Sequence, residues 1–159
     1  MPRTLTKHIT LLQALAAMPA TLRHAFDDVD EAMAHQIPAA GERSMAEIVV
    51  KWIEVEACYR ARLERVVREE RPLLPAWPDE IDQAVETGLS ELIDRFQIAR
   101  KGMLIFLETR SPAEWQRPAI HETYGRTNFH LLVQNLVDHD TLRLNQLLEI
   151  KKILQPTLI

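Results

Sequence analysis

One face of the predicted C-terminal helix combines apolar side chains with two groups that could do chemistry. His139 and Arg143 lie four residues apart, which is about one helical turn, among apolar residues that recur every three or four positions. A charged side chain on a face that meets a core is costly unless it is paired. Both residues are therefore expected to be paired or functional. The apolar members of this face are Phe129, Leu132, Leu136, Leu147, Ile150 and Leu154.

The spacing of this pair suggests a metal site, but one residue type does not fit it. Two histidines four apart, with a third ligand from another helix, would form an open three-nitrogen site for Zn²⁺ or Ni²⁺. Arg143 occupies the second position. A guanidinium has five N–H donors, no acceptor, and stays protonated in proteins. It cannot bind a metal ion.

The periodicity along the chain predicts four helices, over residues 4–26, 44–71, 79–110 and 127–154. Ser44 and Glu47 have the spacing of a capping box, and Thr127 is a candidate N-cap. On the first helix the face is predicted to comprise Leu5, Ile9, Leu12 and Ala16, with Pro19 bending or breaking it. The face of the third helix carries no charge and comprises Ile81, Val85, Leu89, Leu92, Phe96, Ala99, Met103 and Phe106.

These helices predict an all-α fold, a four-helix bundle in a single domain over residues 1–159. Residues 71–78 contain three prolines, which favour an extended path, so the second and third helices need not form a tight hairpin. Residues 27–43 and 111–126 are predicted to be long connectors. The acidic cluster within residues 27–31 is interpreted as a solvated helix end.

Composition excludes several classes of protein. The 159 residues are 47% hydrophobic and 26% charged, with a net charge of −4, which argues against general nucleic-acid binding. No run approaches the roughly 20 apolar residues of a membrane span.

The single cysteine, Cys58, excludes an internal disulfide and suits a reducing, cytoplasmic location. Cys58 is predicted to pack in the core, and the tryptophans to anchor core and loops. His8, His24, His35 and His130 are predicted to lie on the surface or on helix flanks.

Five segments of the chain resemble the DinB/YfiT-like family of four-helix bundles. They are SMAEIVVKWIEVE (44–56), RPLLPAW (71–77), SPAEW (111–115), HETYGRT (121–127) and DHD (138–140). The resemblance implies an up-down-down-up arrangement and a homodimer. It also implies a divalent metal held by three histidines, one on the second helix and a pair four apart on the last. Members include metal-dependent hydrolases and thiol-dependent S-transferases or isomerases.

Carried over by position, the implied ligand set falls on Lys51, His139 and Arg143. Only His139 is of the expected type, and a protonated lysine has no lone pair to offer. The metal site is therefore predicted to be degenerate, without tight binding of Zn²⁺ or Ni²⁺. His121 and Tyr124 fall where the family pattern lies near the mouth of the site. The alternative interpretation gives His121 no role in a site: it would face solvent or cap a turn.

Three interpretations of this cationic group remain open. Lys51 and Arg143 could pair with carboxylates in a structural network with His139. Alternatively, the three residues could form a pocket for the carboxylate or phosphate of a small anionic molecule. A metal could also bind through water or acidic ligands, in an enzyme with a different ligand set. A structural homodimer without a working pocket is a further alternative. The candidate carboxylate partners are Glu47, Glu54, Glu56, Asp138 and Asp140.

Overall fold

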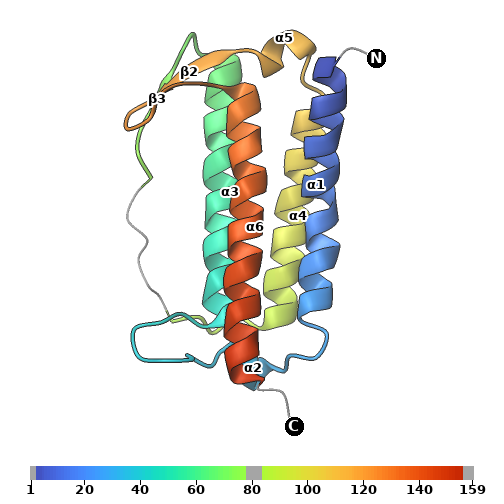
Figure 1. The fold of residues 1–159 in the computed structure, drawn as a ribbon, viewed down its shortest axis with the longest axis vertical. Coiled ribbons are helices and arrows are strands. Elements are labelled where there is room, and N and C mark those ends of the chain that lie inside the picture. The colour runs from blue at the N-terminus through green and yellow to red at the C-terminus, as the bar shows by residue number, and fades with distance from the viewer. Residues whose placement is uncertain (1–2, 78–83, 156–159) are drawn as a thin grey trace.

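Four long helices build the bundle in the computed structural model, which describes residues 3–77 and 84–155. They are α1 (Arg3–Ala25), α3 (Met45–Arg68), α4 (Leu89–Glu108) and α6 (Phe129–Leu154). Helices α3 and α4 run in one direction, while α1 and α6 run in the other (Figure 1). Each of α1 and α3 packs against both α4 and α6. The predicted all-α four-helix bundle is confirmed. None of the described helices is long and apolar enough to cross a bilayer.

The predicted helix starts are close to the observed ones for α3 and α6. The Ser44 side chain accepts a hydrogen bond from the Glu47 backbone N–H, as the sequence predicts for an N-cap. Helix α6 is capped by Asn128, whose side chain accepts from the Leu131 N–H. The predicted cap, Thr127, lies one residue earlier, in a strand.

Helix α4 starts later than predicted. Asp79 and Ile81 lie outside the described residues, residues 84–88 are not helical, and α4 begins at Leu89. Gly88 precedes it in an extended conformation and has no side chain to cap the helix, and glycine is also a poor helix former. Glu31, from the short helix α2 (Glu31–Ala34), supplies the missing acceptor: its carboxylate oxygens lie 2.9 and 3.1 Å from the Leu89 nitrogen. The acidic segment therefore caps a neighbouring helix as well as meeting solvent.

The connector over residues 111–126 is not a simple loop. It contains α5 (Pro112–Trp115), β2 (Pro118–His121) and the start of β3 (Gly125–Asn128). Strand β2 pairs antiparallel with β3 and parallel with β1 (Leu73–Leu74), so the chain after α3 adds a third strand. This small sheet covers one end of the bundle (Figure 1). Leu74 and Ala119 are buried beneath it.

The inner face of α1 differs from the predicted one. Its buried residues are Leu11, Leu15 and Leu22, whereas Ile9 is 39% exposed. Leu12 is half-buried and Ala16 is exposed, and Leu5 lies among the residues whose side chains are not described. Apolar residues occur on both sides of α1, so spacing alone does not decide which side faces the core. Pro19 is accommodated inside the helix.

The buried apolar side chains form two clusters along the bundle. One lies toward the sheet and includes Leu15, Tyr59, Met103 and Leu136. The other lies toward the opposite end and includes Leu22, Trp52, Phe96 and Leu147. On every long helix the change from one cluster to the other occurs near its middle. The charged side chains described next lie at that level.

Candidate functional site

A buried layer of ionic hydrogen bonds joins the four long helices at mid-height. The Arg100 side chain of α4 is fully buried. Its Nε and Nη2 donate to the two Glu56 carboxylate oxygens at 2.7 and 3.0 Å, and its Nη1 and Nη2 donate to Asp140 at 2.7 and 2.8 Å. A fifth hydrogen bond runs from Nη1 to the Leu15 carbonyl oxygen at 3.0 Å. All five guanidinium N–H donors are therefore used.

This layer corrects two expectations. The inner face of α4 does carry a charge, because Arg100 lies one turn from both Phe96 and Met103 and is as inward-facing as they are. In addition, Glu56 and Asp140 were two of the candidate partners for Lys51 and Arg143, and both accept hydrogen bonds from Arg100. Burial lowers the pKa of Arg100, but the hydrogen bonds to Asp140 and Glu56 outweigh it and raise the pKa above its ordinary value.

Trp52 adds a neutral donor to this layer. Its indole Nε1 donates to Asp140 Oδ1 at 2.8 Å, and its ring lies 5.0 Å from that of Phe96. A buried tryptophan needs such a partner for its N–H. The predicted anchoring role is confirmed for Trp52 and also for Trp115, which is 2% exposed.

His139 and Arg143 contact each other directly on α6. The Arg143 Nε lies 3.2 Å from the His139 Nε2, and the Arg143 Nη1 donates to the Gln146 Oε1 at the same distance. Because a guanidinium only donates, His139 Nε2 must be the acceptor in this contact. Its lone pair is then directed at Arg143. Arg143 is buried, and His139 is half-buried.

Lys51 lies on α3, the helix that packs against the α6 helix of His139 and Arg143. It is 3% exposed, and its Nζ lies 3.8 Å from a Glu54 carboxylate oxygen whose side chain is itself 53% exposed. Of the carboxylates that the sequence suggested, Glu54 is thus one that does approach Lys51. Such a contact with a solvated carboxylate is weak, because water screens it.

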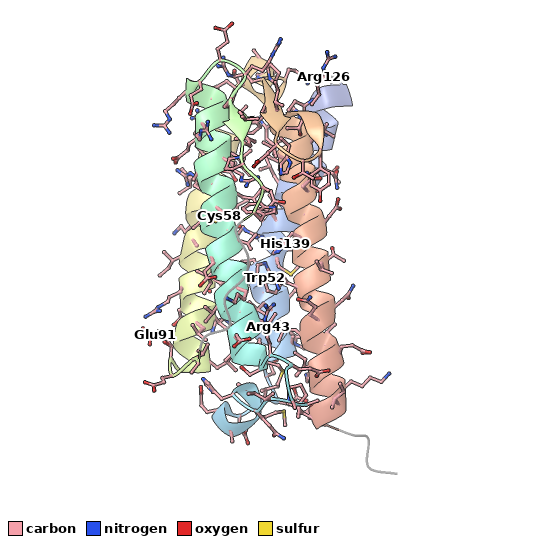
Figure 2. The ribbon with its side chains drawn as sticks, turned by 90° about the vertical axis from the view of Figure 1, so that its left-hand side faces the viewer. Arg43, Trp52, Cys58, Glu91, Arg126 and His139 are labelled. Carbon is pink, nitrogen blue, oxygen red and sulfur yellow. The ribbon has the colours of Figure 1, made fainter. Side chains whose placement is uncertain are left out.

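The packing of α3 against α6 fixes the relative heights of these residues. The two helices are antiparallel, and Ile48 of α3 and Gln146 of α6 line the same groove. Lys51 lies three residues after Ile48 on α3, and Arg143 lies three residues before Gln146 on α6. Because the helices are antiparallel, both steps lead about 4.5 Å toward the sheet. Lys51 and Arg143 therefore lie at similar heights on the two packed helices α3 and α6. Figure 2 shows Trp52 and His139 at mid-height of the bundle and Arg43 nearer the end where α6 terminates.

An aromatic group borders His139 on the sheet side. The Tyr59 ring lies 6.4 Å from the His139 ring and 5.0 Å from the Trp77 ring. Burial raises the pKa of Tyr59 to about 12. Arg62 stacks on Trp77 at 3.7 Å and donates to the Pro75 carbonyl oxygen. The segment after β1 is therefore attached to α3 next to His139, as expected of an anchoring tryptophan.

His121 and Tyr124 lie at the sheet end. The His121 Nδ1 accepts hydrogen bonds from the backbone nitrogens of Thr123 and Tyr124 at 3.0 and 3.1 Å. His121 thus caps its own turn, as the structural interpretation predicted. Its side chain is buried rather than solvent-facing. Tyr124 packs beside it with ring centroids 4.8 Å apart and is 84% exposed.

Two other sequence expectations change. His8 was predicted to lie on the surface or on a helix flank, but it is 5% exposed and stacks on Trp115, with ring centroids 3.9 Å apart. Burial lowers the pKa of His8, and the nearby His130 lowers it further. Cys58, predicted to pack in the core, is only half-buried.

The comparison with protein families matches residues 14–147 to the model of the DinB superfamily. This match spans most of the chain, including all of α3 and α4 and parts of α1 and α6. The chain belongs to the DinB superfamily. The resemblance to this family is thereby confirmed.

A solved structure supports the fold of this DinB-superfamily chain. It is described as "YfiT from Bacillus subtilis is a probable metal-dependent hydrolase with an unusual four-helix bundle topology". The two chains are 15% identical and superpose with a TM-score of 0.80, over 91% of this chain and 86% of that one. At this identity the likeness establishes the fold alone. The comparison with curated proteins found no match.

The residues at the implied metal position do not fit a metal ion. Within residues 3–77 and 84–155, no group of three or more His, Cys, Asp or Glu side chains is arranged to hold one. His139 Nε2 faces the Arg143 guanidinium, and cationic Lys51 and Arg143 side chains have no lone pair for an ion. The chemistry of this donor set suits an anion.

Proposed function

We propose that this DinB-superfamily chain binds a small anionic ligand, a carboxylate or phosphate, between Lys51 and Arg143 without a metal ion. The supporting observation is that Lys51 and Arg143 are both buried on the facing helices α3 and α6, while the Glu47 side chain, one turn before Lys51, is 13% exposed and forms an ion pair with Arg43. Among the residues described, the buried charged side chains other than histidine are four cations and two carboxylates, and both carboxylates bind Arg100. They are Lys51, Arg62, Arg100 and Arg143 against Glu56 and Asp140.

The contacts of Arg143 suit this role. Its Nε and Nη1 donate to neutral acceptors on its own helix, which hold the planar group in one orientation. A guanidinium fixed in this way can present two parallel N–H groups to a carboxylate or phosphate, while a lysine adds a point charge. In a mostly buried site, the attraction of these charges for an anion is stronger than in water.

Binding can be tested by calorimetry with acetate and inorganic phosphate on protein without a histidine tag. We expect Arg143→Leu to abolish binding of both probes. Arg143→Lys keeps the charge but loses the planar fork, and we expect it to bind more weakly than the parent. Arg126→Leu is a matched control, because Arg126 is exposed at the far end of the bundle (Figure 2). Unchanged binding in Arg143→Leu would make Arg143 purely structural.

The two alternative functions predict different results in the same experiments. A metalloenzyme with another ligand set would retain Zn²⁺ or Ni²⁺ in stoichiometric amount, and that metal would disappear in His139→Ala. This result would contradict the metal-free proposal. A purely structural network would bind neither acetate nor phosphate at any concentration tested.

A further inference from the structure

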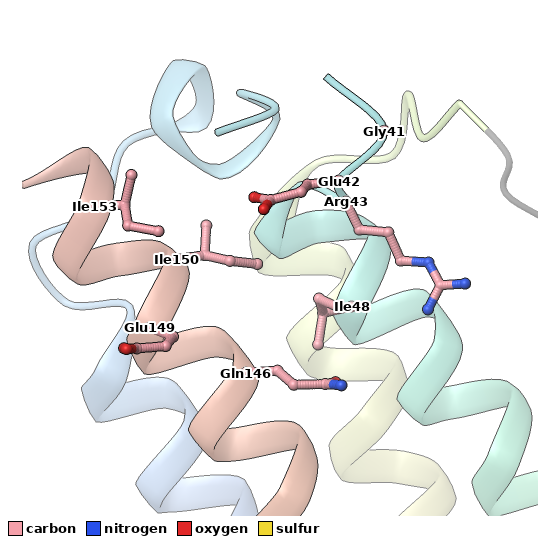
Figure 3. A pocket seen from close by; sticks show the side chains of 8 residues that line it. All are labelled: Gly41, Glu42, Arg43, Ile48, Gln146, Glu149, Ile150 and Ile153. Atoms are coloured by element: carbon pink, nitrogen blue, oxygen red, sulfur yellow. The ribbon is translucent and has the colours of Figure 1, made fainter. Parts of the chain in front are cut away.

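A groove opens on the side of the bundle next to the cationic pair. It lies between α6, the start of α3 and the loop before α3, and its volume is about 480 Å³ (Figure 3). That volume is within the usual range for small-molecule pockets. Its apolar lining comes from three isoleucines, Ile48, Ile150 and Ile153.

The polar side chains around the groove come from two segments. Gln146 and Glu149 lie on α6, whereas Glu42 and Arg43 come from the loop before α3, where Arg43 pairs with Glu47 at 3.3 Å (Figure 3). Gln146 also accepts a hydrogen bond from Arg143, so the same amide borders the groove and the cationic pair. Ile48 and Gln146 are each three residues, or about 4.5 Å of helix, from Lys51 and Arg143. The groove and the cationic pair are therefore adjacent along the α3–α6 seam.

We propose that the natural ligand is an amphiphilic monoanion, an aliphatic monocarboxylate. Its head binds at Arg143 and Lys51, and its tail lies along Ile48, Ile150 and Ile153. This inference rests on the proposed function and adds the chemical class of the ligand. A linear chain buries its methylene groups against the isoleucines, which contributes affinity for each methylene removed from water.

The acidic residues of the groove give the site a charge preference. A dicarboxylate of the same length would bring its second carboxylate to the region of Glu42 and Glu149. Like charges at close range disfavour binding. The site is therefore selective for one anionic end and one apolar end, rather than for two anionic ends.

The test is calorimetric titration with acetate, butanoate, hexanoate and octanoate, and with octanedioate. We expect affinity to rise about fourfold for each methylene that the groove buries. We expect octanedioate to bind at least about tenfold more weakly than octanoate, as a like-charge penalty of about 1.4 kcal/mol gives. Equal affinity for acetate and octanoate would overturn the inference.

Matched variants separate the tail site from the head site. Ile153→Ser removes an apolar side chain that is 57% exposed, so the change is compatible with folding. We expect it to reduce the gain from butanoate to octanoate while leaving acetate binding unchanged. Ile98→Ser is the control, because Ile98 is 72% exposed on α4, outside the groove. An equal effect of both variants would contradict a tail site at Ile153.

The two proposals fail in different ways. If acetate binds through Arg143 but longer chains gain nothing, the anion pocket stands and the groove inference is wrong. If no carboxylate binds, or if octanoate binds equally well to Arg143→Leu, the anion pocket itself is wrong. Loss of all binding in Arg143→Leu, with only a smaller chain-length dependence in Ile153→Ser, is the result expected from both proposals together.

Discussion

At the scale of single residues, Arg100 uses all five of its N–H donors inside the bundle. Its five N–H groups meet two carboxylates and a carbonyl, drawn from the three other long helices. An ion group of this kind need not stabilise more than a well-packed apolar group would. Removing one partner from it is costly, however, because the remaining charges stay buried.

We expect Arg100→Met to lower the free energy of unfolding by about 3–5 kcal/mol, because Glu56 and Asp140 lose their buried cation. Urea denaturation at neutral pH measures this loss. Arg95→Met is the control, since the ion pair of Arg95 with Glu91 is exposed and its removal is expected to change stability by less than about 0.5 kcal/mol. Adding Glu56→Gln and Asp140→Asn to Arg100→Met should recover part of the loss. If stability does not recover in the triple variant, the loss in Arg100→Met is not caused by the unpaired carboxylates.

His8 gives a prediction for the pH dependence of stability. Because its folded-state pKa is lowered from the ordinary 6.5, the unfolded chain binds the proton more tightly. The contribution of neutral His8 is therefore fully present above about pH 6.5 and is lost as the pH falls through the folded-state pKa. In His8→Phe, which can keep a stack on Trp115, the loss of stability from about pH 7.5 to about pH 5 should be smaller than in the parent.

Chemical denaturation at the two pH values measures this difference. His24→Phe, an exposed histidine of the same helix, is the control and should keep the loss of the parent. An unchanged loss of stability in His8→Phe would show that other groups cause it.

At the scale of helices, prediction from sequence succeeds where one face is distinct. On α6 the eight predicted residues are buried or half-buried, because the predicted face keeps the helical spacing from Phe129 to Leu154, although Leu131, Leu142, Leu148 and Ile153 lie on the exposed side. On α1 the apolar residues cover two sides, and the predicted face is wrong. The inward position of Arg100 was missed because Ala99 fits the same helical spacing, and only the carboxylates of α3 and α6 decide between them.

Because α3 and α6 pack against each other, a double variant, Lys51→His with Arg143→His, tests whether their side chains can reach one ion. With His139, it would present three imidazoles from two helices, two of them four residues apart, which is a suitable donor set for Zn²⁺. We expect the double variant to bind Zn²⁺ more tightly than the parent, as measured by competition with a chromogenic chelator. Equal affinities would mean that positions 51, 139 and 143 do not converge on one ion.

At the scale of the whole molecule, the parallel course of α3 and α4 follows from the connection between them. The proline-rich segment indicated that no tight hairpin was required, and the helices do run in the same direction (Figure 1). The three-stranded sheet was not predicted. Its strands are two to four residues long, and β1 pairs with β2 across more than forty residues of sequence. Such short, nonlocal pairings leave little periodic pattern in the sequence.

Association between copies is a further proposal at this scale. The family resemblance implies a homodimer, so sedimentation at micromolar concentration should give about twice the 18.3 kDa mass of one chain. Dilution should shift the distribution toward one chain if the association is reversible. A single species of one-chain mass throughout the concentration series would contradict this proposal.

The guanidinium layer has a practical consequence for how this protein is handled. Because side chains and one carbonyl of the polypeptide make that crosslink, a chelator such as EDTA has nothing to extract from it. The melting temperature is therefore expected to be the same before and after prolonged dialysis against EDTA. The residues between α3 and α6 can then be changed to bind other ligands, while the Arg100 layer keeps the four long helices in their present alignment.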